Sequence, residues 1–140
     1  MDALANGNET PVVFSINCAS GLFTKPEPDI CFSEKLLRFE NGGAVGIVSA
    51  TEETSSGYND GLMMGMIDAI WPNPGLIPDL GSGGEQVNVN SPREPIYRMG
   101  DVMIQGLIRM TENWDPIGWA DRDQFHLYHY FGDPAMQFWT

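Results

Sequence analysis

Cys18 is the residue best suited to carry out chemistry, because it comes two residues after the end of a run of mostly β-favouring residues, Val12 to Ile16. The residues at 19–21 are all small, so a carbonyl group could approach the sulfur. A thiol becomes a strong nucleophile when its neighbours favour the thiolate, and the backbone N–H of the cysteine can stabilise the oxyanion that forms. Periodicity alone leaves a second interpretation open, in which Cys18 is a buried and inert thiol.

The other residues that could do chemistry are Cys31, His126 and His129. Cys31 lies in an apolar segment at a spacing that fits neither a zinc knuckle nor a CxxC pair, so we expect a small buried side chain rather than a disulfide with Cys18. His126 and His129 lie at i, i+3 among aromatic residues and are expected to be packing or surface histidines; that one of them is a catalytic base is the less favoured alternative. They lack the further ligands of a tetrahedral metal site, and we expect no metal there.

Two expected strands would position Cys18. The run from Val12 to Ile16 favours a buried, central strand, a helix is expected from Ser33 to about Phe39, and Ala44 to Ala50 favours a second buried strand parallel to the first. Ligands of open parallel sheets sit beyond the carboxyl ends of the strands. We therefore expect Cys18 to lie beside the polar segment 51–60, which leaves the second strand.

The remainder of the chain is expected to cover this unit. A core-facing helix is expected within 61–71, ended by Pro72, and its methionines should pack against the sheet. Residues 73–95 are rich in Gly, Pro, Asn and Ser and predict a long surface loop. A helix from about 100 to 110 should bury one face, made of Met103, Ile104, Leu107 and Ile108. Residues 112–123 are expected to be irregular, and 124–140 to be strand-compatible with a Gly-Asp-Pro turn. The pattern predicts a three-layer α/β fold.

Composition limits the classes of function. The chain has 140 residues, 42% of them hydrophobic, which fits one globular domain. Its net charge of -12 makes nucleic acid or an anionic membrane surface an unlikely partner. We expect no membrane span and see no secretion signal in the first ten residues. Neither GxGxxG nor GxxxxGK[ST] follows a predicted strand, which argues against a nucleotide site.

Three segments, "PVVFSINCASGLF", "CFSEKLLRFENGGAVGIVSATEETSSGY" and "FGDPAMQFW", resemble the C-terminal half of the gingipain-type cysteine peptidase domain. The resemblance runs from about Leu4 to Trp139. It implies a caspase-like three-layer sandwich with a mostly parallel sheet, incomplete because its N-terminal strands are lacking. Residues 1–140 would then be a single partial domain. The resemblance also implies a cysteine endopeptidase, extracellular or at the cell surface, with Cys18 as the nucleophile and Cys31 at a non-catalytic position.

The chain departs from the family in one respect. Relatives carry the catalytic histidine in a His-Gly motif on an earlier strand, whereas none of the 17 residues before Cys18 is a histidine. We therefore expect a missing upstream segment to supply the histidine that shuttles protons, and the isolated chain to be inactive. The missing half of the domain, or another chain, should cover an open sheet edge.

Substrate contacts and cofactors also follow from the resemblance. Gingipains favour Arg or Lys before the scissile bond, which requires a carboxylate, and Glu53 and Tyr58 are our candidate substrate-binding residues; Glu52 and Asp60 flank the same segment. Each acid has the alternative of being a solvated loop charge. The substrate would be a polypeptide, and catalysis would need no cofactor, while structural calcium in the complete domain stays open. The competing functions are an inert caspase-like module for binding or secretion and a small doubly wound ligand-binding domain.

Overall fold

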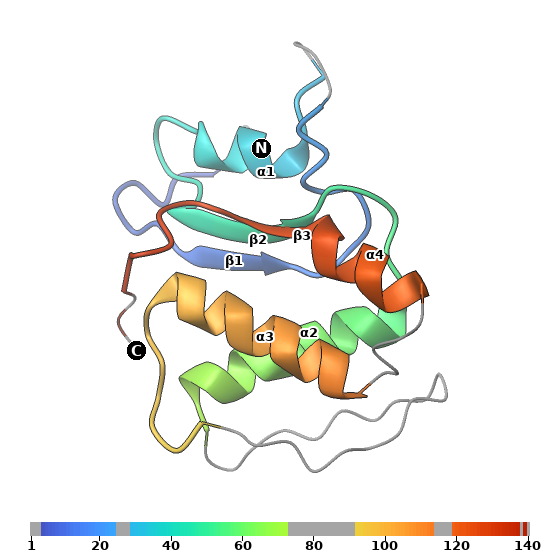
Figure 1. The fold of residues 1–140 in the computed structure, drawn as a ribbon. Helices are drawn as coiled ribbons and strands as arrows, with labels where there is room; N and C mark the ends of the chain where they lie inside the picture. The colour runs from blue at the N-terminus through green and yellow to red at the C-terminus, as the bar shows by residue number, and fades with distance from the viewer. Residues whose placement is uncertain (1–3, 25–28, 73–91, 114–118, 138, 140) are drawn as a thin grey trace.

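The fold is known from a computed structural model that describes residues 4–24, 29–72, 92–113, 119–137 and 139. The elements in chain order are β1 (Val12–Ser15), α1 (Phe32–Leu37), β2 (Gly46–Ala50), α2 (Ser56–Ile70), α3 (Met99–Asn113), α4 (Trp119–Leu127) and β3 (Tyr128–Phe131). Figure 1 shows α1 on one face of the sheet and α2 and α3 on the other. The expected three-layer α/β arrangement is therefore confirmed.

The sheet has the strand order β1-β2-β3 within the described residues. β1 and β2 run parallel with Phe14 opposite Val48, which confirms the predicted strand-helix-strand unit, and β3 pairs antiparallel to β2. The expectation that Val12 to Ile16 would form a central strand was wrong for this sheet. β1 is an edge strand with half-buried residues, whereas all residues of β2 are buried because it has a strand on both sides and helices on both faces.

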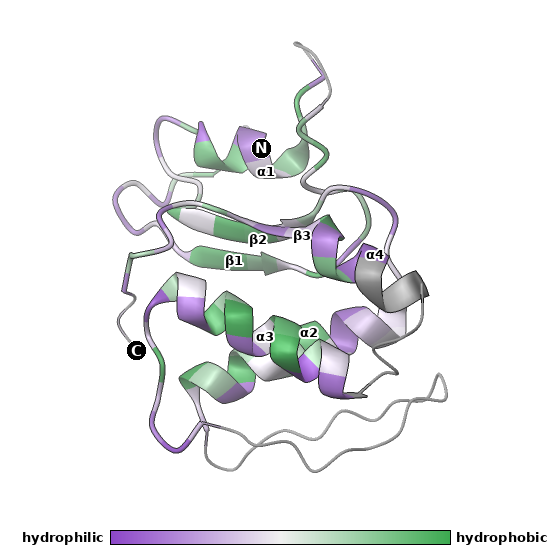
Figure 2. Ribbon diagram, viewed as in Figure 1, coloured by the Kyte–Doolittle hydropathy of each residue, from purple (hydrophilic) through white to green (hydrophobic). Residues whose placement is uncertain are grey.

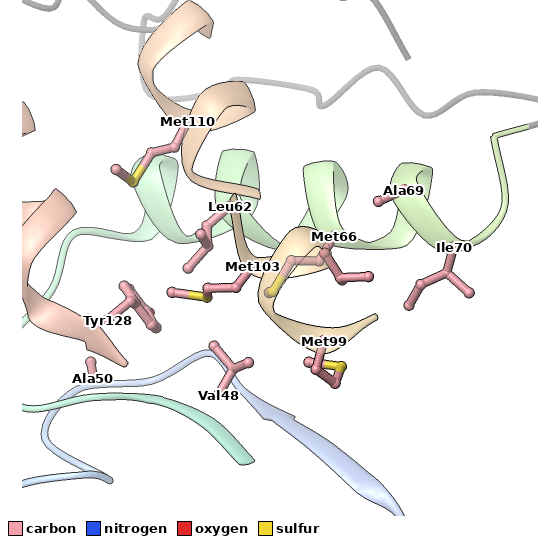
Figure 3. Packing of buried hydrophobic residues seen from close by; sticks show 11 residues of the cluster. Val48, Ala50, Leu62, Met66, Ala69, Ile70, Met99, Met103, Met110 and Tyr128 are labelled. Atoms are coloured by element: carbon pink, nitrogen blue, oxygen red, sulfur yellow. The ribbon is translucent and has the colours of Figure 1, made fainter. Parts of the chain in front are cut away.

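The side chains of β2 alternate between two cores, as the pleat of a strand requires. Ile47 packs with Leu36 and Ala44 under α1. Val48 and Ala50 face the larger core that α2 and α3 close from the other side. Figure 2 shows that hydrophobic residues recur along the strands and along α2 and α3, and Figure 3 shows side chains of Met66, Met99 and Met103 in the space between these helices and β2. The expected core role of the methionines in α2 is confirmed for Met66.

α2 and α3 approach each other closely through two glycines. A Cβ on Gly106 would lie 2.8 Å from the backbone oxygen of Leu62, and a Cβ on Gly65 would lie 2.9 Å from the Cα of Gly106. This contact rotates α3, so Ile104 and Ile108 are exposed and not part of the buried face that we expected. Met99, Val102 and Met110 join Met103 in the core instead.

A buried ion pair lies in the same interface. Arg109 of α3 donates to the carboxylate of Asp68 of α2 at 3.3 Å, and both side chains are almost fully buried. Burial lowers the pKa of the Arg109 guanidinium, while the neighbouring carboxylates of Asp68 and Glu112 oppose this shift. Because its charges are removed from water, the pair ties α2 and α3 in one relative position.

Further expectations concern the segments between the elements and the ends of the elements. The segment 51–60 is not all loop, since α2 begins at Ser56. The expectation of irregular chain over 112–123 was wrong at both ends, because α3 extends to Asn113 and α4 begins at Trp119. Residues 124–127, which we expected to be strand-compatible, also belong to α4, where Thr51, the residue after β2, holds the last turn through hydrogen bonds to the Leu127 oxygen. The Gly-Asp-Pro turn is confirmed by the bond from Met136 N–H to the Asp133 oxygen. Most of the predicted 73–95 loop lies outside the described residues.

Candidate active site

Cys18 lies exposed just beyond the carboxyl end of β1. The chain turns sharply there, because Ala19 has a φ of +52°, a left-handed conformation that is unfavourable for a residue with a Cβ. The turn is held by hydrogen bonds to the chain that leaves β2: Ala19 N–H donates to the Glu52 oxygen at 2.8 Å, and Gly21 N–H donates to the Ala50 oxygen at 2.8 Å. The backbone that follows the thiol is therefore fixed.

The residues after this turn, Ser20 and Gly21, contact the sheet and α1. A Cβ on Gly21 would lie 2.9 Å from the ring of Phe131, so only glycine fits where the chain crosses the sheet. Ser33 of α1 donates to the Ser20 oxygen at 3.0 Å and its hydroxyl lies 2.6 Å from that of Ser49 in β2. A buried line of serines thus joins the cysteine turn, α1 and the sheet.

The sulfur of Cys18 contacts Thr54, in the loop between β2 and α2. Thr54 N–H donates to Sγ at 3.4 Å, the Thr54 hydroxyl lies 3.7 Å from Sγ, and the protonated thiol can donate to the Thr54 carbonyl oxygen at 3.5 Å. The backbone and side-chain hydrogen bonds of Thr54 lower the pKa of the thiol, and the carboxylate of Glu53 works against them. Donors that face a sulfur favour its anionic form. The prediction that the loop leaving the second strand lies beside the thiol is therefore confirmed.

Two buried polar side chains lie near Thr54. Asn59, in the first turns of α2, donates from Nδ2 to the Thr54 hydroxyl at 2.9 Å. Burial raises the pKa of Tyr128 to about 12, with a further contribution from the Cys18 charge, while the Thr54 side chain opposes the shift. The Tyr128 hydroxyl and the Asn59 Oδ1 both lack a hydrogen-bond partner of ordinary geometry among the described residues. A polar cluster thus extends inward from the exposed thiol.

The comparisons with known proteins agree with this geometry. The family model for peptidase family C25 matches residues 1–139. The chain belongs to peptidase family C25. Two solved structures share the fold, the Arg-specific cysteine proteinase gingipain R (RgpB) and a complex of Porphyromonas gingivalis RgpB pro- and mature domains. Each has a TM-score of 0.72 and 20% sequence identity. No curated protein sequence matches the chain.

The C25 chain is similar to only part of these structures. The match covers 96% of this chain but 27% of each solved chain. It confirms the expected gingipain-type, caspase-like fold, with the three described strands corresponding to a portion of a larger chain.

The candidate residues of this C25 chain are not all brought together. Glu53 is exposed and close enough to Cys18 to affect its pKa. Tyr58 is half-buried in α2 and packs against the larger core, a packing role that the sequence had not suggested. Cys31 is buried at the start of α1 and is a free thiol, as is Cys18.

The two histidines face aromatic side chains. The ring of His129 lies edge-on to Phe23 and Phe131, each with a centroid distance of 6.2 Å. The ring of His126 packs edge-on to Phe125. No hydrogen bond joins either imidazole to Cys18 in the part of the C25 chain that the structure describes.

Sequence reasoning missed Thr54 and Asn59. Thr54 stands in a polar loop where no pattern distinguishes it from its neighbours. Asn59 had a signal: it lies three residues before Leu62, on the stripe that continues to Met66, and a polar residue on a buried stripe indicates a special role. Nothing in the pattern said that its partner would be a threonine beside the cysteine.

The described part of the C25 chain has one further feature that bears on function. A cavity of about 520 Å³ lies at the amino end of β1, against the C-terminal end of α2 and so at the opposite end of this helix from Asn59. Its walls are mostly apolar and include Val12, Phe14, Val45, Ile70, Trp71 and Trp139. Among the described residues, no group of three or more His, Cys, Asp or Glu side chains is arranged to hold a metal ion, and none of the helices has the length and apolar character to cross a membrane.

Proposed function

We propose that this chain is the nucleophile-bearing part of a cysteine endopeptidase domain. The observation that supports the proposal is the position of Cys18: an exposed thiol at the carboxyl end of a parallel strand, with a backbone N–H donor 3.4 Å from its sulfur. Sγ would attack the carbonyl carbon of a peptide bond and form a C–S bond. The C–N bond then breaks as the amine takes a proton, and water hydrolyses the thioester.

The general base in this proposal is a histidine from a segment outside these 140 residues. The ring contacts of His126 and His129 with aromatic side chains, given above, support this assignment, because a base must reach the proton that it removes. The 27% coverage of the solved gingipain chains also leaves ample chain to carry such a histidine. The isolated 140-residue chain would then have little or no peptidase activity.

The same upstream segment, or another chain, is proposed to cover the edge of β1. The cavity at the amino end of β1 is lined mainly by apolar side chains, with Trp71 52% and Trp139 99% exposed. An edge strand beside exposed apolar side chains is a surface that usually pairs with further chain.

Glu53 and Tyr58 are the proposed substrate contacts. The exposed carboxylate of Glu53, beside Cys18, is suited to a basic residue of a polypeptide substrate, and one of the similar structures is named as Arg-specific. Tyr58 would offer only the part of its ring that does not pack against the core. An extracellular or cell-surface location is proposed on the family membership.

The decisive experiment compares Cys18→Ala with Cys31→Ala in the complete peptidase domain. Hydrolysis of a fluorogenic peptide library should be lost in the first variant and kept in the second. Cleavage that survives Cys18→Ala would refute the nucleophile. A complete domain that cleaves nothing in its unmodified form would favour an inert caspase-like module instead.

The separate claim about the base is tested on the 140-residue chain alone. We expect no turnover that depends on Cys18. If the isolated chain cleaves peptides and Cys18→Ala abolishes this, the base lies within the chain, and His126→Ala and His129→Ala would show which histidine it is.

A further inference from the structure

The Thr54 hydroxyl lies between a hydrogen-bond donor, the amide of Asn59, and a possible acceptor, the sulfur of Cys18. Asn59 Nδ2 donates to Thr54 Oγ1 at 2.9 Å, and Oγ1 is 3.7 Å from Cys18 Sγ. A hydroxyl has one proton to donate and two lone pairs to accept with. Because the amide of Asn59 uses a lone pair, the hydroxyl proton is left to point at another acceptor. Two acceptors lie near it, the sulfur of Cys18 at 3.7 Å and the phenol oxygen of Tyr128, whose pKa the Thr54 side chain lowers.

Asn59 is buried, and its position keeps its amide group on the Thr54 hydroxyl. Its side chain is 6% exposed and lies on a helix whose neighbouring residues fill the core, while its Oδ1 has no partner among the described residues. An unpaired buried polar atom costs about 1–3 kcal/mol. An apolar side chain would avoid that cost, so packing alone does not explain an asparagine here.

The charges around the sulfur come from three elements. Glu53, in the loop before α2, raises the pKa of Cys18, and the Tyr128 phenol of β3 is buried and neutral near it. Asp60 of α2 acts on Tyr128. None of these groups supplies positive charge, so hydrogen-bond donors must carry any stabilisation of a thiolate.

We propose that Asn59 is a positioning residue, which turns the Thr54 hydroxyl proton toward Cys18 so that the N–H and O–H of Thr54 together hold the sulfur as a thiolate. The inference rests on the proposed function only in taking Cys18 as the nucleophile. Its test measures the ionisation of the Cys18 thiol and not peptide cleavage. The inference can therefore fail while the peptidase proposal stands, and the peptidase proposal can fail while the inference stands.

The experiment follows alkylation of Cys18 by iodoacetamide across pH in the 140-residue chain, with peptide mapping by mass spectrometry to separate Cys18 from Cys31. Thr54→Val and Asn59→Leu each keep a side chain of similar size and remove the polar group. Each should move the midpoint of the rate profile upward and slow alkylation at pH 7 about three- to tenfold, the effect of losing one hydrogen bond. The plateau at high pH should not change.

Two controls and a double variant separate positioning from packing. Thr54→Ser keeps the hydroxyl and should restore the profile, and Thr51→Val removes a hydroxyl that bonds Leu127 instead of the sulfur and should leave the profile unchanged. If Asn59 acts through Thr54, the double variant should be no slower than Thr54→Val alone.

An unchanged midpoint in Asn59→Leu, or fully additive effects in the double variant, would overturn the proposal. So would a lower plateau with an unchanged midpoint, since this would show altered access and not altered ionisation. Circular dichroism checks that each variant is folded. If Asn59→Leu is not, Asn59→Ala takes its place with the same expected shift.

Discussion

The contact between α2 and α3 predicts that Gly106→Ala destabilises the protein although alanine is the better helix former. The new Cβ would lie 2.6 Å from Met66 Cγ and 2.8 Å from the backbone oxygen of Leu62. Met66 can turn away, but the Leu62 oxygen belongs to the backbone of α2, so the two helices must separate. Forcing extra atoms into a packed interface costs about 1–3 kcal/mol, and because a backbone atom cannot turn away we expect the upper part of this range, about 2–3 kcal/mol.

The helix propensity of alanine returns part of this cost, about 1 kcal/mol. The net expectation is a loss of about 1–2 kcal/mol in the free energy of unfolding, or about 2–8 °C in Tm for a chain of this size. Urea unfolding followed by circular dichroism measures the first, and a thermal scan measures the second. Gln105→Ala, the neighbouring position on α3, is the matched control and should change stability by less than about 0.5 kcal/mol.

A Gly106→Ala variant as stable as the unmodified chain, or more stable, would refute the reasoning. It would mean that helix propensity outweighs the contact and that α2 and α3 are not in backbone contact at this glycine. A loss shared by the Gln105→Ala control would point to a general weakness of α3 instead.

Three further predictions concern other parts of the structure. Asp68→Ala removes the buried partner of Arg109 and should lower the free energy of unfolding by about 3 kcal/mol in urea titrations, whereas Asp68→Leu with Arg109→Met should recover most of it. Tyr128→Phe should keep or slightly raise stability at pH 7, because the hydroxyl that it removes is buried and has no hydrogen-bond partner of ordinary geometry in the described part of the chain. The pKa of Tyr128 is raised from 10.0 to about 12, so its contribution is complete below pH 10 and is lost as the pH rises through 12; unfolding measured across this range should show a loss that Tyr128→Phe reduces. Ala19→Gly should relieve the left-handed strain at φ +52° and be neutral or stabilising by up to about 1 kcal/mol in thermal scans, the reverse of what a glycine does in a helix.

The sequence allowed much of the frame to be predicted, because its signals were local. A β-branched run that ends in Cys18, and a second run that ends at Ala50, were enough to place the thiol beside the loop that contains Thr54. The role of β1 as an edge strand was not predictable, since a run of apolar residues reads the same whether one or both sides are paired.

Errors in the helices had a different cause. The apolar spacing of α3 counted Ile104 and Ile108 as buried, but the rotation of the helix is set by Gly106, whose lack of a side chain permits close approach. Likewise, the aromatic residues before Tyr128 favoured a strand. In the structure α4 ends at Leu127 instead, where the Leu127 oxygen accepts a hydrogen bond from Thr51. Both outcomes depend on partners distant in the chain, which residue-by-residue patterns do not contain.

The hydrogen bonds of Ala19 and Gly21 to the chain leaving β2 also determine how the thiol moves. They join the turn to the carboxyl end of β2 after the chain has turned back, since residue 19 bonds to residue 52 and residue 21 to residue 50, so the turn that carries Cys18 opens only when these bonds to the end of β2 break. The amide protons of these two residues should therefore exchange with solvent as slowly as those of β2, in spite of their place in a surface turn. An alkylating reagent then reacts with Cys18 while the turn is closed. Differences between variants in the alkylation rate of Cys18 therefore reflect the ionisation of the thiol rather than local unfolding.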